Sequence, residues 1–412
     1  MSFDALWNAL EPIGRDGRTG GYRRFAWTPA DLACRDWFTA AAQDRSLDVE
    51  TDRNGNLWAW WGDPAAGDAV VIGSHLDSVP DGGAYDGPLG VVSAFAALDE
   101  LRTGRGITPL RPVAVAAFSD EEGARFGVAC GGSRLMTGAL DADRARGLRD
   151  SDGTTMAEAM AAAGHDPANL GADPARLATI GCFVELHIEQ GRVRLETADG
   201  LTFGLAGLGV PLGLASGIWP HGRWRIEFTG RADHAGTTRL EDRDDPMLLF
   251  AATVFAAREA AIRHDALATI GKVRVDPNGV NAIPSGVTAW LDVRGADEPR
   301  VRAVVDDLAG DLGRQRDDVR VTEESWTAPT TFDATLRARM ARILGDPPII
   351  PTGAGHDAGI LAAAGIRSAM VFVRNPTGVS HSPLEHAERE DCLSGVTALA
   401  AVVADLATDE DS

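Results

Sequence analysis

Short apolar runs alternate with helical segments through much of the chain, and this alternation constrains the fold more than any other sequence feature. The runs at 69–72 (AVVI) and 112–118 (PVAVAAF) are typical of buried strands, and residues 90–102 between them have helical apolar spacing. Similar apolar runs occur at 183–186 and 369–373. Strands that alternate with helices predict a mostly parallel α/β sheet that is covered by helices on both faces.

The region from about 218 to 328 has a different pattern. Apolar and polar residues alternate with period two in three runs, at 224–228, 272–275 and 287–293. Helical segments at 246–263 and 299–314 separate these runs, which favours a small α+β sandwich of two layers. We therefore expect a catalytic domain made of residues 1–217 and 329–412, with a smaller domain inserted at 218–328.

Polar clusters follow the predicted strands of the larger domain, at the end of the sheet where α/β proteins bind their ligands. The clusters contain three imidazoles and several carboxylates, His75, Asp77, Asp86, Glu121, Glu122, His187 and His381. Each residue alone suits an ordinary role, such as a hydrogen-bonded strand end, a turn or a helix start. Because all of them are expected at one end of the sheet, and imidazole with carboxylate binds zinc, manganese or cobalt, the sequence predicts a catalytic metal site.

The expected roles follow from the chemistry of such a site. Two metals about 3.5–4 Å apart need a bridging carboxylate. In the sequence, Asp86 lies between the polar residues that follow the predicted strand 69–72 and those that follow the predicted strand 112–118. In the adjacent pair Glu121–Glu122, one carboxylate can bind a metal while the other takes a proton from the attacking water. Asp77 stands two residues after His75 and suits a residue that fixes the tautomer of that imidazole.

Composition excludes several classes of partner. The net charge of −21 provides no basic surface for nucleic acid or for an anionic membrane. No apolar run approaches the roughly 20 residues of a membrane span, and from the first residues we expect no signal peptide. The four dispersed cysteines are expected to be reduced thiols in a cytoplasmic protein. Lys272 is the only lysine among 39 basic residues, so a cation that binds a substrate carboxylate is expected to be an arginine.

The motifs resemble those of the M20 family of two-metal amidohydrolases and peptidases. They are most similar to the branch of N-carbamoyl-L-amino acid hydrolases, β-ureidopropionases and allantoate amidohydrolases. The matching runs lie at 73–91, 120–126, 185–191, 230–238, 277–284, 291–295, 353–358 and 378–383. They follow the family's order over nearly the whole chain, and the runs LHIEQG and GAGHDA are specific to this branch.

The resemblance implies a metal site with two divalent ions, of zinc, manganese or cobalt. It implies the ligands His75, Asp86 and His187 for one ion, and Asp86, Glu122 and His381 for the other. Glu121 would be the general base and acid. His187 stands where the peptidases of the family have a carboxylate, which favours the branch that cleaves ureido groups.

The resemblance also implies roles in the inserted domain, which in the family forms a homodimer and closes over the substrate. His234 would support the tetrahedral oxyanion, often across the dimer interface, and Arg294 with Asn281 would bind the substrate carboxylate. Gln190 and His356 match polar positions that line the pocket. Without the resemblance, Arg294 suits a surface salt bridge, and His234 and Asn281 suit turns.

The implied function is hydrolysis of the C–N bond of an N-carbamoyl-L-amino acid or of a ureido acid such as allantoate. An N-formyl or N-acyl amino acid amidohydrolase, a dipeptidase and a non-catalytic binding protein are the alternatives. The small substrate is an anion, so local positive charge from the metals and Arg294 has to overcome the negative charge of the protein. Two features depart from the family pattern. The segment at 192–211 is about ten residues longer than usual, and the run Cys130-Gly-Gly-Ser133 replaces the bulky residue that the family more often has before its Gly-Ser pair.

Overall fold

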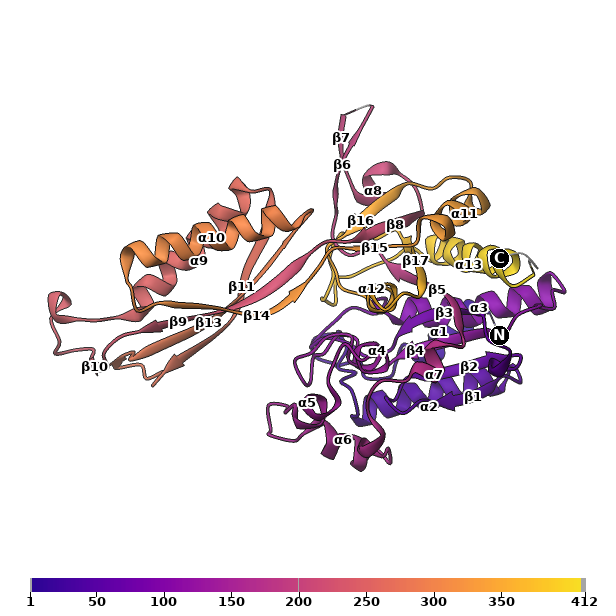
Figure 1. Cartoon of the computed structure of the whole chain (residues 1–412), viewed down its shortest axis with the longest axis horizontal. Coiled ribbons are helices and arrows are strands. Elements are labelled where there is room, and N and C mark those ends of the chain that lie inside the picture. Colours follow the sequence, from indigo (N-terminus) through magenta and orange to yellow (C-terminus); the bar gives the residue numbers. More distant parts are fainter. Residues whose placement is uncertain (1, 199, 409–412) are drawn as a thin grey trace. The chain divides into compact units, whose positions relative to one another are not determined.

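The structure is a computed structural model that describes residues 2–198 and 200–408. The chain divides into two compact units, one made of residues 1–217 and 331–412 and the other of residues 218–330 (Figure 1). The boundaries expected from the sequence differ from these by at most two residues.

A mixed, nine-stranded sheet forms the centre of the first unit, in the order β1-β2-β4-β3-β5-β17-β8-β15, with β16 paired to β8. Its strands are β1 (Asp48–Thr51), β2 (Leu57–Trp61), β3 (Ala69–His75), β4 (Val113–Phe118), β5 (Ile180–Ile188), β8 (Leu212–Ile218), β15 (Thr330–Thr331), β16 (Ile349–Thr352) and β17 (Arg367–Val373). The four central strands β4, β3, β5 and β17 are parallel, and β1, β2 and β8 pair antiparallel. Every residue of β3 and β4 is buried, as expected for parallel strands covered on both faces.

Helices cover both faces of this sheet, which confirms the predicted α/β class. One face carries α1 (Phe3–Leu10), α2 (Pro29–Gln43), α3 (Pro88–Asp99), α11 (Ala334–Leu344) and α13 (Arg389–Thr408). On the other face, α12 (Asp357–Ala363) packs against β5, β17 and α4 (Gly131–Thr137). Shorter helices are α5 (Ala142–Gly147), α6 (Met156–Ala162), α7 (Pro174–Leu177) and α8 (Gly204–Leu208).

The C-terminal helix α13 differs from the expectation that no segment is long and apolar enough to span a membrane. An 18-residue window within it has a mean hydropathy of 1.4. However, 61% of that window is buried, because α13 packs against α3, α11 and β17 in the core of the first unit. The apolar character of α13 is therefore explained by its place in the core.

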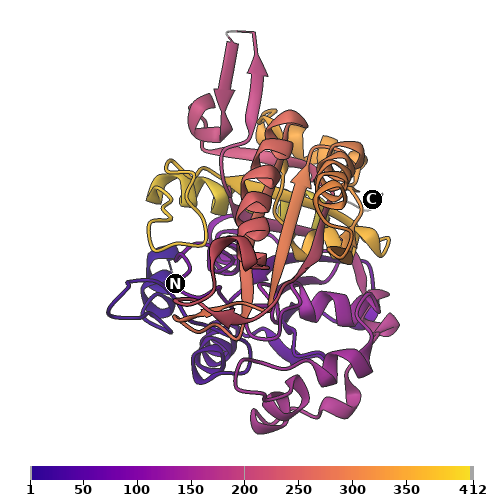
Figure 2. The same cartoon turned by 90° about the vertical axis from the view of Figure 1, so that its left-hand side faces the viewer.

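The second unit is an antiparallel sheet with two helices on one face, which confirms the predicted α+β class. The sheet has the order β11-β13-β9-β14, and its strands are β9 (His221–Thr229), β11 (Ala266–Asp276), β13 (Gly286–Gly295) and β14 (Arg320–Thr327). The helices α9 (Pro246–Arg263) and α10 (Glu298–Gln315) run side by side over it (Figures 1 and 2). At one end, β10 (Asp233–His234) pairs with β12 (Ala282–Ile283).

The longer segment expected at 192–211 contains a hairpin and a short helix. The hairpin strands β6 (Arg194–Thr197) and β7 (Gly200–Phe203) pair with each other in a sheet of their own. The hairpin extends away from the large sheet in both views (Figures 1 and 2). The chain then enters α8, whose Leu205 is fully buried, so the insertion is anchored at its base.

Candidate metal centre

The predicted metal ligands meet at the carboxyl ends of the parallel strands. His75 is the last residue of β3, and His187 lies one residue before the end of β5. The other three ligands come from loops that follow strands, Asp86 after β3, Glu122 after β4 and His381 after β17. This placement agrees with the rule that open α/β sheets bind ligands at this edge.

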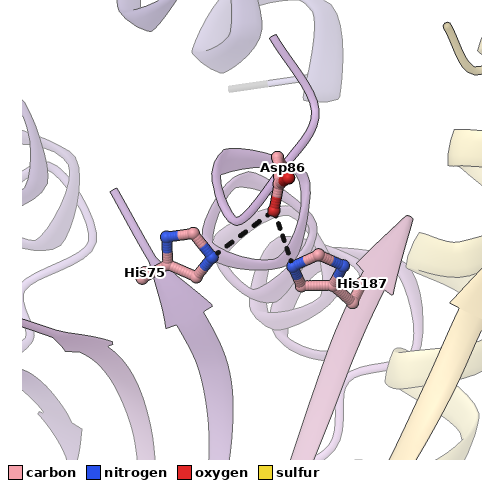
Figure 3. Close-up of side chains that lie close together, drawn as sticks. All are labelled: His75, Asp86 and His187. Carbon is pink, nitrogen blue, oxygen red and sulfur yellow. Dashed lines mark ion pairs between the residues drawn. The ribbon is translucent and has the colours of Figure 1, made fainter. Parts of the chain in front are cut away.

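The first cluster consists of His75, Asp86 and His187 (Figure 3). All three side chains are buried. Asp86 Oδ1 lies 3.2 Å from Nε2 of His187 and 3.7 Å from Nε2 of His75. The three ligand atoms lie within 4.8 Å of one another, so that one cation can contact all of them.

The second cluster uses the other oxygen of the same aspartate. Asp86 Oδ2 lies 3.4 Å from Nε2 of His381, and that nitrogen lies 3.4 Å from Oε2 of Glu122. Asp86 therefore directs one carboxylate oxygen toward each cluster. This is the arrangement of a carboxylate that bridges two cations.

Buried polar atoms without partners show that these residues fit divalent cations. His75 Nε2 and Glu122 Oε1 are buried, and neither has a hydrogen-bond partner in the described part of the chain. Leaving such an atom unsatisfied costs about 1–3 kcal/mol. A cation would satisfy both atoms, and a mixed set of imidazoles and carboxylates suits zinc, manganese or cobalt.

Backbone carbonyl groups orient the two imidazoles of the first cluster. His75 Nδ1 lies 3.2 Å from the carbonyl oxygen of Asp77, and His187 Nδ1 lies 2.8 Å from that of Ile188. A carbonyl oxygen only accepts hydrogen bonds, so in both residues Nδ1 carries the proton and Nε2 is left to bind a cation. Gly87 has a φ of +85°, and a Cβ there would lie 2.4 Å from the His75 ring.

Asp77 does more than the sequence predicted. Its carboxylate lies 3.5 Å from His75 Nδ1, but it also accepts the backbone N–H groups of Glu121 and Glu122, at 3.0 and 3.1 Å. Asp77 therefore ties the loop after β4 to the loop after β3. This contact sets where both glutamates lie relative to His75.

Glu121 lies beside the first cluster and is buried. Its Oε2 lies 3.7 Å from Nε2 of His75, and its Oε1 accepts a hydrogen bond from the thiol of Cys130 at 3.3 Å. Burial raises the pKa of Glu121 well above its usual range, and the charges of Asp357 and Glu122 raise it further. A carboxyl group with a raised pKa is a stronger base than an ordinary glutamate and can return the proton later.

The imidazoles and carboxylates also shift the pKa values of one another. Burial disfavours a charged His75, but the carboxylates of Glu121 and Asp77 outweigh it and raise the pKa of this imidazole. Burial likewise disfavours the ionised form of Asp86, but His187 and the other imidazoles lower the pKa of this carboxyl group. The site thus holds Asp86 in the ionised form that binds cations.

Two residues predicted to line the pocket lie against the ligands. Gln190 Nε2 donates hydrogen bonds to Asp86 Oδ2 at 2.9 Å and to Ser380 Oγ at 3.1 Å. The ring of His356 lies 4.5 Å from that of His187, and neither of its buried nitrogens has a hydrogen-bond partner among the described residues. Burial and the neighbouring His187 lower the pKa of His356 well below its usual range, so this imidazole is neutral.

The residues predicted in the inserted domain do not gather in one place within the second unit. His234 pairs with Ala282 in the short ladder β10–β12, next to Asn281, whose carbonyl oxygen accepts a hydrogen bond from the N–H of Ala235. Arg294 lies near the other end of β13, where it pairs with His221. The eight residue steps of β13 from Gly286 to Arg294 span roughly 27 Å.

Arg294 forms an ion pair with a near neighbour. Its Nε lies 2.7 Å from Asp292 Oδ1, and its Nη2 lies 3.1 Å from Asp292 Oδ2. The structure therefore contains the salt bridge that the sequence offered as the alternative to substrate binding. The same contact holds the guanidinium in one orientation, which also suits a residue that binds a carboxylate.

Sequence reasoning missed several polar residues of the site. Glu185 is buried in β5 and accepts hydrogen bonds from Ser74 Oγ at 2.8 Å and from the N–H of Ala358 at 3.0 Å. Glu385 accepts hydrogen bonds from the N–H groups of Tyr85 and Asp86. Glu185 begins the motif run 185–191 and Glu385 lies two residues after the run 378–383. A carboxylate inside a predicted buried strand was the available signal for Glu185. The partners of both glutamates are far away in the sequence, so no local pattern indicates them.

Comparisons with known proteins agree with this geometry. A sequence profile of the peptidase family M20/M25/M40 matches residues 71–405. The N-carbamoyl-L-amino acid amidohydrolase of Geobacillus stearothermophilus is 36% identical over 422 aligned residues, which cover 99% of each chain. The allantoate amidohydrolase of Escherichia coli (strain K12) is 32% identical and covers 97% of this chain and 96% of its own. An amidase of the hydantoinase/carbamoylase family from Burkholderia vietnamiensis has a TM-score of 0.87 at 29% identity and covers 99% of this chain and 98% of its own.

Proposed function

The chain belongs to the peptidase family M20/M25/M40, in the branch of hydantoinase/carbamoylase amidases and allantoate amidohydrolases, and from this premise we propose its substrates. It is a hydrolase of C–N bonds, and the proposed substrates are N-carbamoyl-L-amino acids or a related ureido acid such as allantoate. The observation that carries this proposal is the shared Asp86, with one oxygen toward His187 and the other toward His381, next to the buried Glu121.

Different residues of the site have different roles in the proposed reaction. His75, Asp86 and His187 would hold one divalent cation and Asp86, Glu122 and His381 another, and the cations would supply Lewis acidity and lower the pKa of water. Glu121 takes a proton from the attacking water and returns it to the leaving nitrogen. The thiol of Cys130 donates a hydrogen bond to Oε1 of Glu121, and the other carboxylate oxygen, Oε2, faces His75.

The proposed reaction needs no reactant other than the substrate and one water molecule. Water adds to the carbamoyl carbon, and the bond from that carbon to the amino acid nitrogen breaks. The nitrogen leaves with the proton that Glu121 carries, which gives a free amino acid and carbamate. The carbamate then decomposes to carbon dioxide and ammonia. His234 is proposed to stabilise the oxyanion, and Arg294 to bind the substrate carboxylate.

A homodimer is part of the same proposal. In the second unit, His234 and Asn281 lie in and beside the β10–β12 ladder at the Gly286 end of β13, whereas Arg294 lies near the other end, roughly 27 Å of strand from Gly286. One small substrate is therefore not expected to contact all three in a single chain. On the helix α9, the side chains of Leu248, Phe255 and Ile262 are exposed to solvent, with exposed fractions of 73%, 71% and 70%. These side chains repeat every seven residues and form one apolar stripe, which is typical of a protein interface.

The proposed location is the cytoplasm. All four cysteines are buried free thiols, as expected in a reducing compartment. With a net charge of −21, neither nucleic acid nor an anionic membrane is proposed as a partner.

A substrate panel tests the proposal. The purified protein is loaded with Mn²⁺, Co²⁺ or Zn²⁺ and assayed for release of amino acid and ammonia. The panel contains N-carbamoyl-L-amino acids and allantoate, with N-formyl and N-acetyl amino acids and dipeptides as the competing classes. We expect turnover of a carbamoyl or ureido acid to exceed that of the other classes. Faster turnover of dipeptides or N-acetyl amino acids would replace the proposed substrate class, and no turnover of any of them would refute it.

A further inference from the structure

We infer that Glu385 is a positioning residue that holds the bridging carboxylate of Asp86 in place through the backbone. The inference rests on the proposed metal site and concerns a residue that binds neither metal nor substrate. Glu385 is 5% exposed. Its Oε1 accepts two hydrogen bonds, from the N–H groups of Tyr85 and Asp86, both at 3.0 Å.

These two hydrogen bonds act at the peptide groups from which the side chain of Asp86 projects. The loop between β3 and α3 contains no helix or strand, so regular structure does not fix the backbone at Asp86. Yet Asp86 has to direct Oδ1 toward His187 and Oδ2 toward His381 at the same time, at 3.2 and 3.4 Å. A small rotation of this backbone would move one oxygen out of reach of its cluster.

Glu385 also connects this loop to the loop that carries His381. The hydroxyl group of Ser380 lies 3.3 Å from Glu385 Oε2 and 3.2 Å from Asp86 Oδ2. Glu385 thus contacts the residue before His381 as well as the backbone of Asp86. One buried carboxylate therefore sets the position of the bridging ligand relative to a ligand of the second cluster.

Gly83 leaves the space that this carboxylate needs. A Cβ built on Gly83 would lie 2.3 Å from Glu385 Oε1 and 2.4 Å from its Cδ. Any side chain at position 83 would therefore displace the carboxylate of Glu385 from the two N–H groups. This provides a way to move Glu385 without replacing it.

The test measures binding of Mn²⁺ and Zn²⁺ to the metal-free, full-length protein by isothermal titration calorimetry. The variants are Glu385→Ala, Glu385→Gln and Gly83→Ala. Glutamine keeps an oxygen that accepts both N–H groups, whereas alanine does not. We expect Glu385→Ala and Gly83→Ala to weaken metal binding by about 10- to 100-fold, and Glu385→Gln to stay within about threefold of the wild type.

The control separates positioning from general loss of stability. Asp52 is a buried carboxylate that also accepts two backbone N–H groups, from Asn54 and Asn56, at 2.8 and 3.0 Å. Asp52→Ala is expected to lower the melting temperature in EDTA while leaving the metal Kd unchanged. The inference would be overturned if a folded Glu385→Ala or Gly83→Ala variant bound metal with the Kd of the wild type. It would also be overturned if Asp52→Ala weakened metal binding as much as these variants do. Failure of the wild type to bind metal would instead refute the proposed function.

Discussion

Asp86 illustrates, at the scale of a single residue, how much of the site depends on one side chain. Its two oxygens face imidazoles from different loops and strands, and its backbone N–H is bound by Glu385. Gln190 reaches the same carboxylate. Two segments that are both far from Asp86 in the sequence, 187–190 and 381–385, therefore converge on one residue, which explains why its environment is so strongly constrained.

Replacing Glu121 by glutamine tests the proposed base. Glutamine has nearly the same shape but cannot take a proton, so we expect kcat to fall by about 10²- to 10⁴-fold while the metal content stays unchanged. Steady-state kinetics and elemental analysis of the same preparation measure both quantities. Glu122→Gln is the matched control, because it removes a ligand and is expected to lower the metal content. Turnover that survives in Glu121→Gln would show that the base is another residue.

At the scale of elements, Glu189 anchors the base of the hairpin and has a raised pKa. Glu189 follows the end of β5, and its two carboxylate oxygens accept the N–H of Leu205 at 3.1 Å each, near the start of α8. Burial raises the pKa of Glu189 to about 7. The folded protein therefore holds the proton of Glu189 at pH values where the unfolded chain releases it.

This shift predicts a loss of stability as the pH rises. The folded pKa lies above the unfolded one, so the stability contributed by Glu189 is complete below about pH 4.5 and is lost as the pH passes through about 7. In Glu189→Gln this titration is absent. We expect its unfolding free energy, relative to the wild type, to rise by about 2 kcal/mol between pH 5 and pH 8. Urea unfolding in EDTA measures the difference, Glu196→Gln on the exposed hairpin is the control, and a difference that does not change with pH would contradict the prediction.

The hairpin itself is expected to be dispensable for folding. Residues 194–197 pair only with residues 200–203 among the described residues, and Leu201 and Phe203 are 51% and 46% exposed. The backbone N–H of Gly204 donates a hydrogen bond to the carbonyl oxygen of Val193 at 2.9 Å, so the two ends already meet. Replacing 194–203 by Asn-Gly should change the melting temperature by about 2 °C or less. A calorimetric melt checks this, and a loss of cooperative unfolding would show that the hairpin supports the core.

At the scale of the whole molecule, the distance between Asn281 and Arg294 predicts how two chains share a site. If both residues act on one substrate, we expect them to come from different chains, because Asn281 lies at the Gly286 end of β13 and roughly 27 Å of strand separates Gly286 from Arg294. Asn281→Ala and Arg294→Ala homodimers are both expected to be inactive. In a hybrid dimer of the two variants, one site has both defects and the other has none, so about half of the wild-type activity should return.

Hybrid dimers purified through two different affinity tags provide this measurement. If both residues served the site from the same chain, every site of the hybrid would have one defect and no activity would return. Light scattering on the same samples checks that the hybrid is a dimer. Phe255→Glu in the apolar stripe of α9 is the control that should produce monomers.

The fold class and the kinds of side chain in the site could be predicted from the sequence. Period-two and helical patterns distinguish the inserted α+β unit from the α/β unit, because they record which faces are buried. Residues such as His75 and Glu122 follow strands whose carboxyl ends must meet at one edge of a parallel sheet. That rule needs no knowledge of the loops, so the candidate ligands could be predicted.

Which of these groups contact one another can be seen only in the folded chain. Asp77 binds backbone N–H groups more than 40 residues away, and Glu385 binds one 299 residues away. The apolar α13 proved to be a core helix because of what packs against it. Asn281 and Arg294 proved to be far apart because a whole strand lies between them. The physical reason is common to all: a local pattern reports the burial of a residue, whereas its partners depend on the paths of loops and on packing between distant segments.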